Sequence, residues 1–196
     1  MSTDRKIERG LWLSVFSVTI LAFMVTGGWA ETRVVPRQIG IHAIENPESE
    51  FKVNLWTDRD DVTYKVGDEI KFFFKSSRDC YLTLFNVGTS GKVHILFPNE
   101  HSKENLVKAG TTYSVPGDAA RFVFKAEKPG GEDLIKAIAT LKKVELFSKA
   151  DGKTAGGVTE LNKTEEKAAR DILISLKPVE TKKWATSEKV INIIEQ

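Results

Sequence analysis

Three segments of the chain alternate apolar and polar side chains with a period of two. They are residues 51–57, 69–75 and 120–126. In the first segment the apolar face consists of Phe51, Val53, Leu55 and Thr57, opposite Lys52, Asn54 and Trp56. This period is typical of an antiparallel strand that is buried on one face only. The pattern therefore predicts half-buried strands in these segments, and a last strand is predicted over 189–194.

Glycine and proline separate the predicted strands at short intervals. The turn sequences are Gly67-Asp68, Gly88-Thr89-Ser90-Gly91, Pro98-Asn99, Pro116-Gly117-Asp118 and Pro129-Gly130-Gly131. Short strands separated by such turns are typical of a β-sandwich or barrel. The glycine-containing stretch 149–157 indicates a flexible loop instead. We therefore expect a mainly β fold.

One helix is predicted, over residues 164–176. Thr164 can cap its N-terminus, and Glu165 and Glu166 lie where the helix dipole favours negative charge. Its apolar stripe consists of Ala168, Ala169, Ile172, Leu173 and Leu176, and Pro178 follows its end. A stripe of this kind must be buried against another element, so the helix is expected to pack on the sheets.

The first thirty residues have the pattern of a secretory signal peptide. Basic residues precede an uncharged stretch over 10–30, and cleavage is expected before Glu31. The folded part would then lie in the periplasm or at the cell surface. The alternative is a retained membrane anchor, because the uncharged stretch is long enough to cross a bilayer. Residues 31–50 show little periodicity and are expected to form a linker to a single domain over 51–196.

Composition narrows the classes of function. The chain has 196 residues, of which 41% are hydrophobic, and its formal charge is only +2. Without a concentrated basic excess, nucleic acid is not expected as a partner. One cysteine and three histidines exclude a multi-cysteine zinc site, and no metal or cofactor is predicted. Asp58, Asp60 and Asp61 lack the spacing of a calcium-binding loop, so a polar turn is expected there.

A Cys–His pair is the sharpest enzymatic hypothesis, with Cys80 beside His94 or His101. If residues 80–87 and 92–97 form a hairpin, the expected pairs are Val87 with Lys92, Phe85 with His94, and Leu84 with Ile95. Side chains alternate faces along a strand, so Cys80 would point into the core and away from His94. We therefore predict a buried cysteine and assign no catalytic residue.

Several motifs in the middle of the chain resemble a known family. They are Tyr64-Lys65-Val66-Gly67-Asp68, the run from Asp79 to Asn86, and Leu96-Phe97-Pro98-Asn99. Over roughly residues 51–147 the chain is similar to the domain of unknown function 4384 family. The resemblance implies an immunoglobulin-like β-rich module of bacterial exported proteins, found also beside caspase-like peptidases and protein kinases. It supplies no catalytic residues.

Four aromatic side chains are expected on faces away from the main core: Trp56, Phe73, Tyr81 and Phe85. They could form an exposed patch for a partner or glycan, or the helix at 164–176 could cover them. We favour cover by the helix, because its apolar stripe must be buried somewhere.

These observations together predict an immunoglobulin-like antiparallel β-sandwich with one C-terminal α-helix packed on it. The expected function is that of a non-enzymatic exported interaction module that binds a protein partner or an envelope polymer. Its predicted contact residues are Trp56, Tyr81, Asn99 and His101. Two alternatives stay open: a cell-envelope hydrolase that uses Cys80 or a carboxylate pair, and a structural component of a cell-surface assembly. Membrane contact is expected only if the N-terminal segment is kept as an anchor.

Overall fold

Antiparallel strands make up most of the protein in the computed structural model, which describes residues 40–195. The strands are β1 (Val53–Thr57), β2 (Thr63–Lys65), β3 (Glu69–Ile70), β4 (Phe72–Ser76), β5 (Cys80–Val87), β6 (Val93–Phe97), β7 (Leu106–Val107), β8 (Thr112–Val115), β9 (Phe124–Lys125), β10 (Gly131–Thr140), β11 (Gly152–Ala155), β12 (Val158–Leu161) and β13 (Trp184–Ile194). The helices are α1 (Glu165–Leu176) and the short 3-10 turns η1 (Ile41–Ala43), η2 (Lys149–Asp151) and η3 (Thr181–Lys183).

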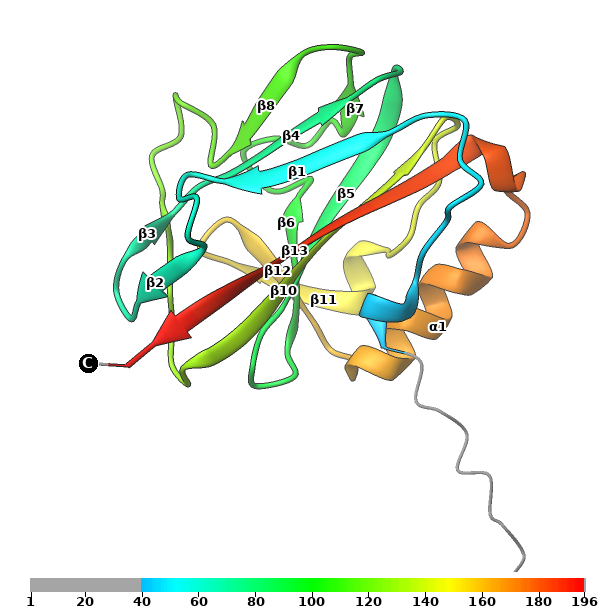
Figure 1. The fold of residues 1–196 in the computed structure, drawn as a ribbon. Helices are drawn as coiled ribbons and strands as arrows, with labels where there is room; N and C mark the ends of the chain where they lie inside the picture. The colour runs from blue at the N-terminus through cyan, green and yellow to red at the C-terminus, as the bar shows by residue number, and fades with distance from the viewer. Residues whose placement is uncertain (1–39, 196) are drawn as a thin grey trace, which may run out of the picture. The chain divides into compact units, whose positions relative to one another are not determined.

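The strands form one large sheet and two small ones (Figure 1). The large sheet has the order β11-β12-β6-β5-β10-β13-β2, and β7 also pairs with β5. The small sheets are β1-β4-β8 and the pair β3-β9. All described pairings are antiparallel except that of β13 with β2. The predicted sandwich of antiparallel sheets with one C-terminal helix is confirmed.

One core lies between the large sheet and the small sheets. The alternation predicted for β1 and β4 is observed: Val53 and Leu55 are buried, and so are Phe72 and Phe74. These side chains pack against residues such as Leu82 from the large sheet. The apolar face that the sequence predicts for each strand therefore faces the opposite sheet.

A second core lies on the other face of the large sheet, under α1. Four residues of the predicted helix stripe are buried there: Ala168, Ala169, Ile172 and Leu176. The fifth, Leu173, is exposed, so the stripe is narrower than predicted. The Thr164 side chain accepts a hydrogen bond from the Lys167 N–H and caps the helix as expected. The helix covers Phe85 but not Trp56 or Phe73, which lie on the outer face of a different sheet.

The predicted linker is wrong for residues 40–50. Ile41 and Ile44 are buried in the second core, at 0% and 1% exposure. The Ile41 N–H donates to the Glu165 carboxylate at 2.8 Å, which fastens this segment to the start of α1. Its apolar residues are too few to show a period, so only the packing reveals that the segment belongs to the domain. The predicted signal peptide and residues 31–39 lie outside the described residues.

Three predicted elements have other bounds. The strand expected over 69–75 breaks at Lys71, whose N–H donates to the Asp58 side chain. The strand expected over 120–126 is reduced to β9, because its partner β3 has only two residues. The last strand is longer than 189–194, because β13 pairs along all of β10.

The stretch 149–157 is not a flexible loop. It contains η2 and β11 and ends in the turn to β12. Gly156 and Gly157 have φ angles of 58° and 88°, and two positive values in succession are those of a tight hairpin turn. The glycines are required by the turn geometry.

The predicted register of the β5–β6 hairpin is wrong by one residue. Val87 pairs with Val93, and Asn86, not Phe85, pairs with His94. The loop is Thr89-Ser90-Gly91, closed by the bond from the Gly88 N–H to the Lys92 carbonyl. The register shifts at a bulge between Phe85, which pairs with Ile95, and Leu84, which pairs with Phe97. Because the side-chain period is two, this shift turns His94 to the face where Leu96 is buried.

Candidate functional site

A cleft of about 540 Å³ is lined by residues of the large sheet and of the β3–β9 pair. Its floor is apolar and is formed by Ile70, Phe72, Leu96, Ile191 and Ile193. Three segments make its walls: the β5–β6 turn, the β11–β12 hairpin, and residues 123–129 around β9. This volume lies in the range of small-molecule and peptide sites, about 300–1,000 Å³. An apolar floor with polar walls is the usual composition of a binding site.

One wall of the cleft carries a cluster of three charged or polar side chains. Glu160 of β12 lies 3.1 Å from the Lys92 ammonium and 3.6 Å from Nε2 of His94. The hydrogen bond from Lys92 lowers the pKa of Glu160, and the nearby His94 adds to this effect. Glu160 therefore stays ionised and acts as an acceptor. In residues 40–195 no group of three His, Cys, Asp or Glu side chains is placed to hold a metal ion.

A second polar group holds the β5–β6 turn at the edge of the cleft. The Asp133 carboxylate accepts hydrogen bonds from the Thr89 N–H at 2.8 Å and from Asn86 Nδ2 at 3.1 Å. Each oxygen of Asp133 thus accepts a hydrogen bond, one from the turn and one from the end of β5. This carboxylate shapes the cleft wall.

Two of the predicted contact residues lie in or near the loop after β6. The His101 ring stacks on Phe122 with centroids 4.6 Å apart, and Gly157 lies against both rings. Gly157 belongs to the β11–β12 turn, so His101 lies beside that turn but is not among the residues that line the cleft. Asn99 is buried; its Oδ1 accepts from the Ser102 N–H at 2.9 Å. Its side chain holds the loop and is not presented to a ligand.

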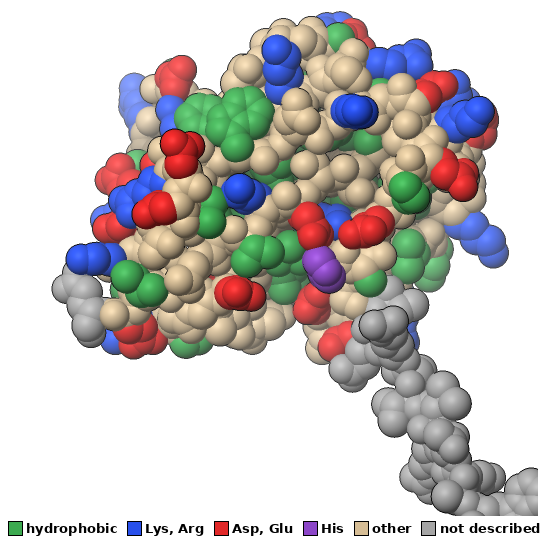
Figure 2. Space-filling model, in the orientation of Figure 1, with side chains coloured by type: hydrophobic (Ala, Val, Ile, Leu, Met, Phe, Trp, Pro, Cys, Tyr) green, Lys and Arg blue, Asp and Glu red, His purple; other side chains and the backbone are tan. Residues whose placement is uncertain are grey.

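The other two predicted contact residues lie away from the cleft. Trp56 is 36% exposed and stacks on Phe73 of β4, with ring centroids 5.8 Å apart. Figure 2 shows hydrophobic surface on this side of β1 and β4. Lys71 lies 5.8 Å from the centre of the Phe73 ring and pairs with Asp118. Tyr81 is half-buried on β5. The four predicted residues therefore do not form one site.

Cys80 is fully buried in the first core. Burial raises the pKa of its thiol, and a hydrogen bond with Ser76 offsets only part of this effect. Cys80 lies six residues along β5 from Asn86, the partner of His94, which corresponds to about 20 Å. The predicted burial of Cys80 is confirmed, although the register from which it was argued is wrong.

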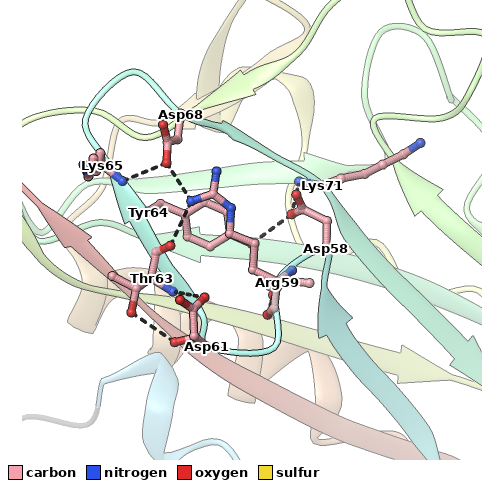
Figure 3. Close-up of polar contacts among 9 residues, drawn as sticks. Asp58, Arg59, Asp61, Thr63, Tyr64, Lys65, Asp68 and Lys71 are labelled. Carbon is pink, nitrogen blue, oxygen red and sulfur yellow. Dashed lines mark hydrogen bonds and ion pairs between the residues drawn. The ribbon is translucent and has the colours of Figure 1, made fainter.

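The family motif Tyr64–Asp68 forms a turn bound to the β1–β2 connection (Figure 3). The buried Tyr64 hydroxyl donates to Asp58 at 2.8 Å, and burial raises the pKa of Tyr64 to about 12. The Arg59 guanidinium lies 4.6 Å from the Tyr64 ring centre and donates to Asp68 at 2.6 Å. The Lys65 N–H also donates to Asp68, and these bonds lower the pKa of that carboxylate. The polar groups of the motif are used to close the turn.

Sequence reasoning missed most of the cleft. Glu160 and Asp133 belong to no motif in the sequence, and the sequence suggests His94 only as a candidate partner of Cys80. Residues 123–127 were read only as part of a strand. The one sequence signal for this wall is the alternation over 120–126 followed by Lys128-Pro129, because lysine and proline are common on edge strands.

The middle of the chain matches a protein-family model. Residues 63–143 match a family model described as "Domain of unknown function (DUF4384)". This range contains the Tyr64–Asp68 turn and the Leu96–Asn99 segment, and it confirms the resemblance predicted from those motifs. No curated protein and no solved structure matches the chain.

Proposed function

We propose, from the premise that residues 63–143 belong to the DUF4384 family, that the protein is an exported, non-enzymatic interaction module. Its cleft would bind a protein partner or a component of the cell envelope. The observation that carries the proposal is the open cleft, which has an apolar floor and walls set on paired strands. Such a site can hold a ligand with little loss of its own conformational freedom.

The chemistry of the cleft supports binding. The only cysteine of the chain is buried elsewhere, and burial raises the pKa of its thiol. Asp133 of β10 is bound to the β5–β6 turn, and Glu160 is paired with Lys92. A nucleophile or a general base needs a free, suitably placed group, and these side chains are already engaged.

The N-terminal sequence supports export. Residues 1–30 combine basic residues with an apolar stretch of signal-peptide length. In the part of the chain that the structure describes, no helix is long and apolar enough to span a membrane.

A capture experiment tests the proposal. The tagged chain is used to capture material from the native envelope fraction, and Val123→Glu is compared with the wild type. Val123 lines the cleft and is 49% exposed, so the substitution places a charge in the cleft without disturbing the core. We expect recovery to fall by about tenfold or more with an unchanged melting temperature.

Two control variants make this experiment specific. Ile174→Glu changes a residue on α1 that is 68% exposed and does not line the cleft, and it should leave recovery unchanged. Trp56→Ala removes the stacked pair on the β1-β4-β8 sheet and should also leave recovery unchanged. Equal recovery with Val123→Glu and wild type would refute the proposed site. If Trp56→Ala were the only variant that lost recovery, the interaction site would lie on the β1-β4-β8 sheet.

A further inference from the structure

The segment around β9 has one bonded edge and one open edge. The Ala126 N–H donates to the Asp68 carbonyl at 2.9 Å, and the Ala126 carbonyl accepts from the Gly67 N–H at 2.9 Å. Two residues earlier, Phe124 pairs with Ile70 of β3. Along a strand, the backbone groups of successive residues point to opposite edges. The N–H and C=O groups of Val123, Lys125 and Glu127 therefore point away from β3.

This open edge faces the cleft. Val123, Lys125 and Glu127 all line it, together with Phe124 and Ala126 between them. Figure 1 shows the chain between β8 and β10 passing beside β3. The five residues span about 16 Å, the length of a short strand. An unpaired strand edge is a ready template for another strand.

The surroundings of the edge favour an uncharged occupant. The cleft is lined by three lysines and three carboxylates, namely Lys92, Lys125, Lys128, Glu127, Asp133 and Glu160. Two of the lysines are already paired, Lys92 with Glu160 at 3.1 Å and Lys128 with Glu195 at 3.5 Å. A site for a phosphate or another polyanion would need an excess of positive charge. The floor below the edge is apolar, with Phe72, Leu96 and Ile191 all nearly fully buried.

We infer that the cleft binds an extended, uncharged peptide segment of a partner protein, which adds as a strand to the open edge at residues 123–127. The backbone of the segment pairs with Val123, Lys125 and Glu127, and alternate side chains of the segment contact the apolar floor. The inference rests on the proposed function of the cleft and names the class of its ligand.

Peptide selection followed by NMR tests the inference. A phage-displayed library of random heptapeptides is panned against the full chain, and an enriched peptide is synthesised with blocked ends. We expect enriched sequences with alternating apolar residues and no proline, since proline lacks the N–H that pairing needs. On binding, amide hydrogen exchange should slow at Val123, Lys125 and Glu127. It should change little at Phe124 and Ala126, whose amides already point to β3.

N-methylation of the peptide provides a test that leaves the protein unchanged. Methylation of every second backbone nitrogen, in the register that faces β9, should weaken binding by about tenfold or more. Methylation in the other register should have little effect. Equal sensitivity in both registers, or protection of amides elsewhere, would overturn the inference.

Other outcomes separate the inference from the proposed function. If no peptide is enriched but Val123→Glu still abolishes capture of an envelope polymer, the strand-addition inference fails and the cleft remains the interaction site. If Val123→Glu changes neither capture nor peptide binding, both fail.

Discussion

Tyr64 shows how single residues of the family motif serve the fold. Its ring is fully buried, and its hydroxyl reaches the carboxylate of Asp58 across the β1–β2 connection. The same Asp58 oxygen also accepts from the Lys71 N–H, at the break between β3 and β4. Tyr64 and Lys71 thus bind the same oxygen of Asp58, which joins the β1–β2 connection to the break between β3 and β4 and gives Tyr64 of the motif a structural role.

Removal of the Tyr64 hydroxyl tests this role. Tyr64→Phe removes one of the two donors to Oδ1 of Asp58, so we expect a loss of about 1–2 kcal/mol in the free energy of unfolding. Urea unfolding measures it. Tyr81→Phe is the matched control, because the Tyr81 side chain makes no hydrogen bond within residues 40–195, and it should change stability by less than about 0.5 kcal/mol. Equal effects of the two variants would contradict the proposed role of Tyr64.

At the scale of elements, a lysine joins the β11–β12 hairpin to α1. The Lys163 ammonium lies 2.6 Å from Asp151 of η2 and 2.7 Å from Asp171 of α1. The hydrogen bond from Lys163, with further bonds from Ser148, lowers the pKa of Asp151 from 3.8 to about 2. Because the β11–β12 hairpin forms a wall of the cleft, this contact helps to fix the position of that wall.

The lowered pKa predicts how stability depends on pH. Since the folded protein holds Asp151 ionised more strongly than the unfolded chain, its contribution is present above pH 3.8 and is lost as the pH falls toward about 2. Asp151→Asn should therefore be less stable than the wild type near neutral pH, and the difference should shrink at acidic pH. Urea unfolding across this pH range measures the difference.

A double-variant cycle provides the control for the pH prediction. In the background of Lys163→Met the main partner of Asp151 is absent, so Asp151→Asn should have a smaller effect near neutral pH. An unchanged effect in that background would show that the Ser148 bonds, and not Lys163, are responsible.

At the scale of the whole molecule, the segment before β1 completes the second core. Ile41 and Ile44 are buried against the large sheet and α1. The same segment covers Lys136, which is 1% exposed and donates to the His42 carbonyl at 3.2 Å and to Glu188 at 2.8 Å. A buried lysine without partners would be costly, so this segment also satisfies a charge inside the fold.

Truncation of Ile41 tests whether this segment is part of the folded unit. Ile41→Ala removes a fully buried side chain and should lower the free energy of unfolding by about 2–4 kcal/mol. Ile174→Ala is the control, because this residue of α1 is 68% exposed, and it should cost less than about 0.5 kcal/mol. Urea unfolding measures the free energy of unfolding of both variants. If residues 40–50 were a linker, Ile41→Ala would not lower it.

The cleft also belongs to the whole molecule. The matched family range, residues 63–143, supplies the β5–β6 turn and the open edge at β9. The β11–β12 hairpin and the floor residues Ile191 and Ile193 lie outside that range. The shape of the cleft therefore depends on residues that the family match does not cover.

The sequence by itself determined the elements whose pattern is local. The alternation in 51–57 and 69–75 identified the buried faces of β1 and β4, and the cap and stripe at 164–176 identified α1. Burial of Cys80 also followed from its place in an apolar strand. Period and capping depend on residues a few positions apart, so they can be read along the chain.

Only the tertiary structure decided the features that depend on distant contacts. The β5–β6 register rests on a bulge and a three-residue turn, and one residue of shift moved His94 to the other face. Ile41 is buried with residues of α1, and the neighbouring His42 carbonyl accepts a hydrogen bond from Lys136, 94 residues away in the chain. The strand edge beside the cleft is open because β9 pairs with β3 on one side and, within residues 40–195, with no strand on the other. These features depend on which surfaces of distant elements come into contact. The local pattern of residues along a single strand does not specify those contacts.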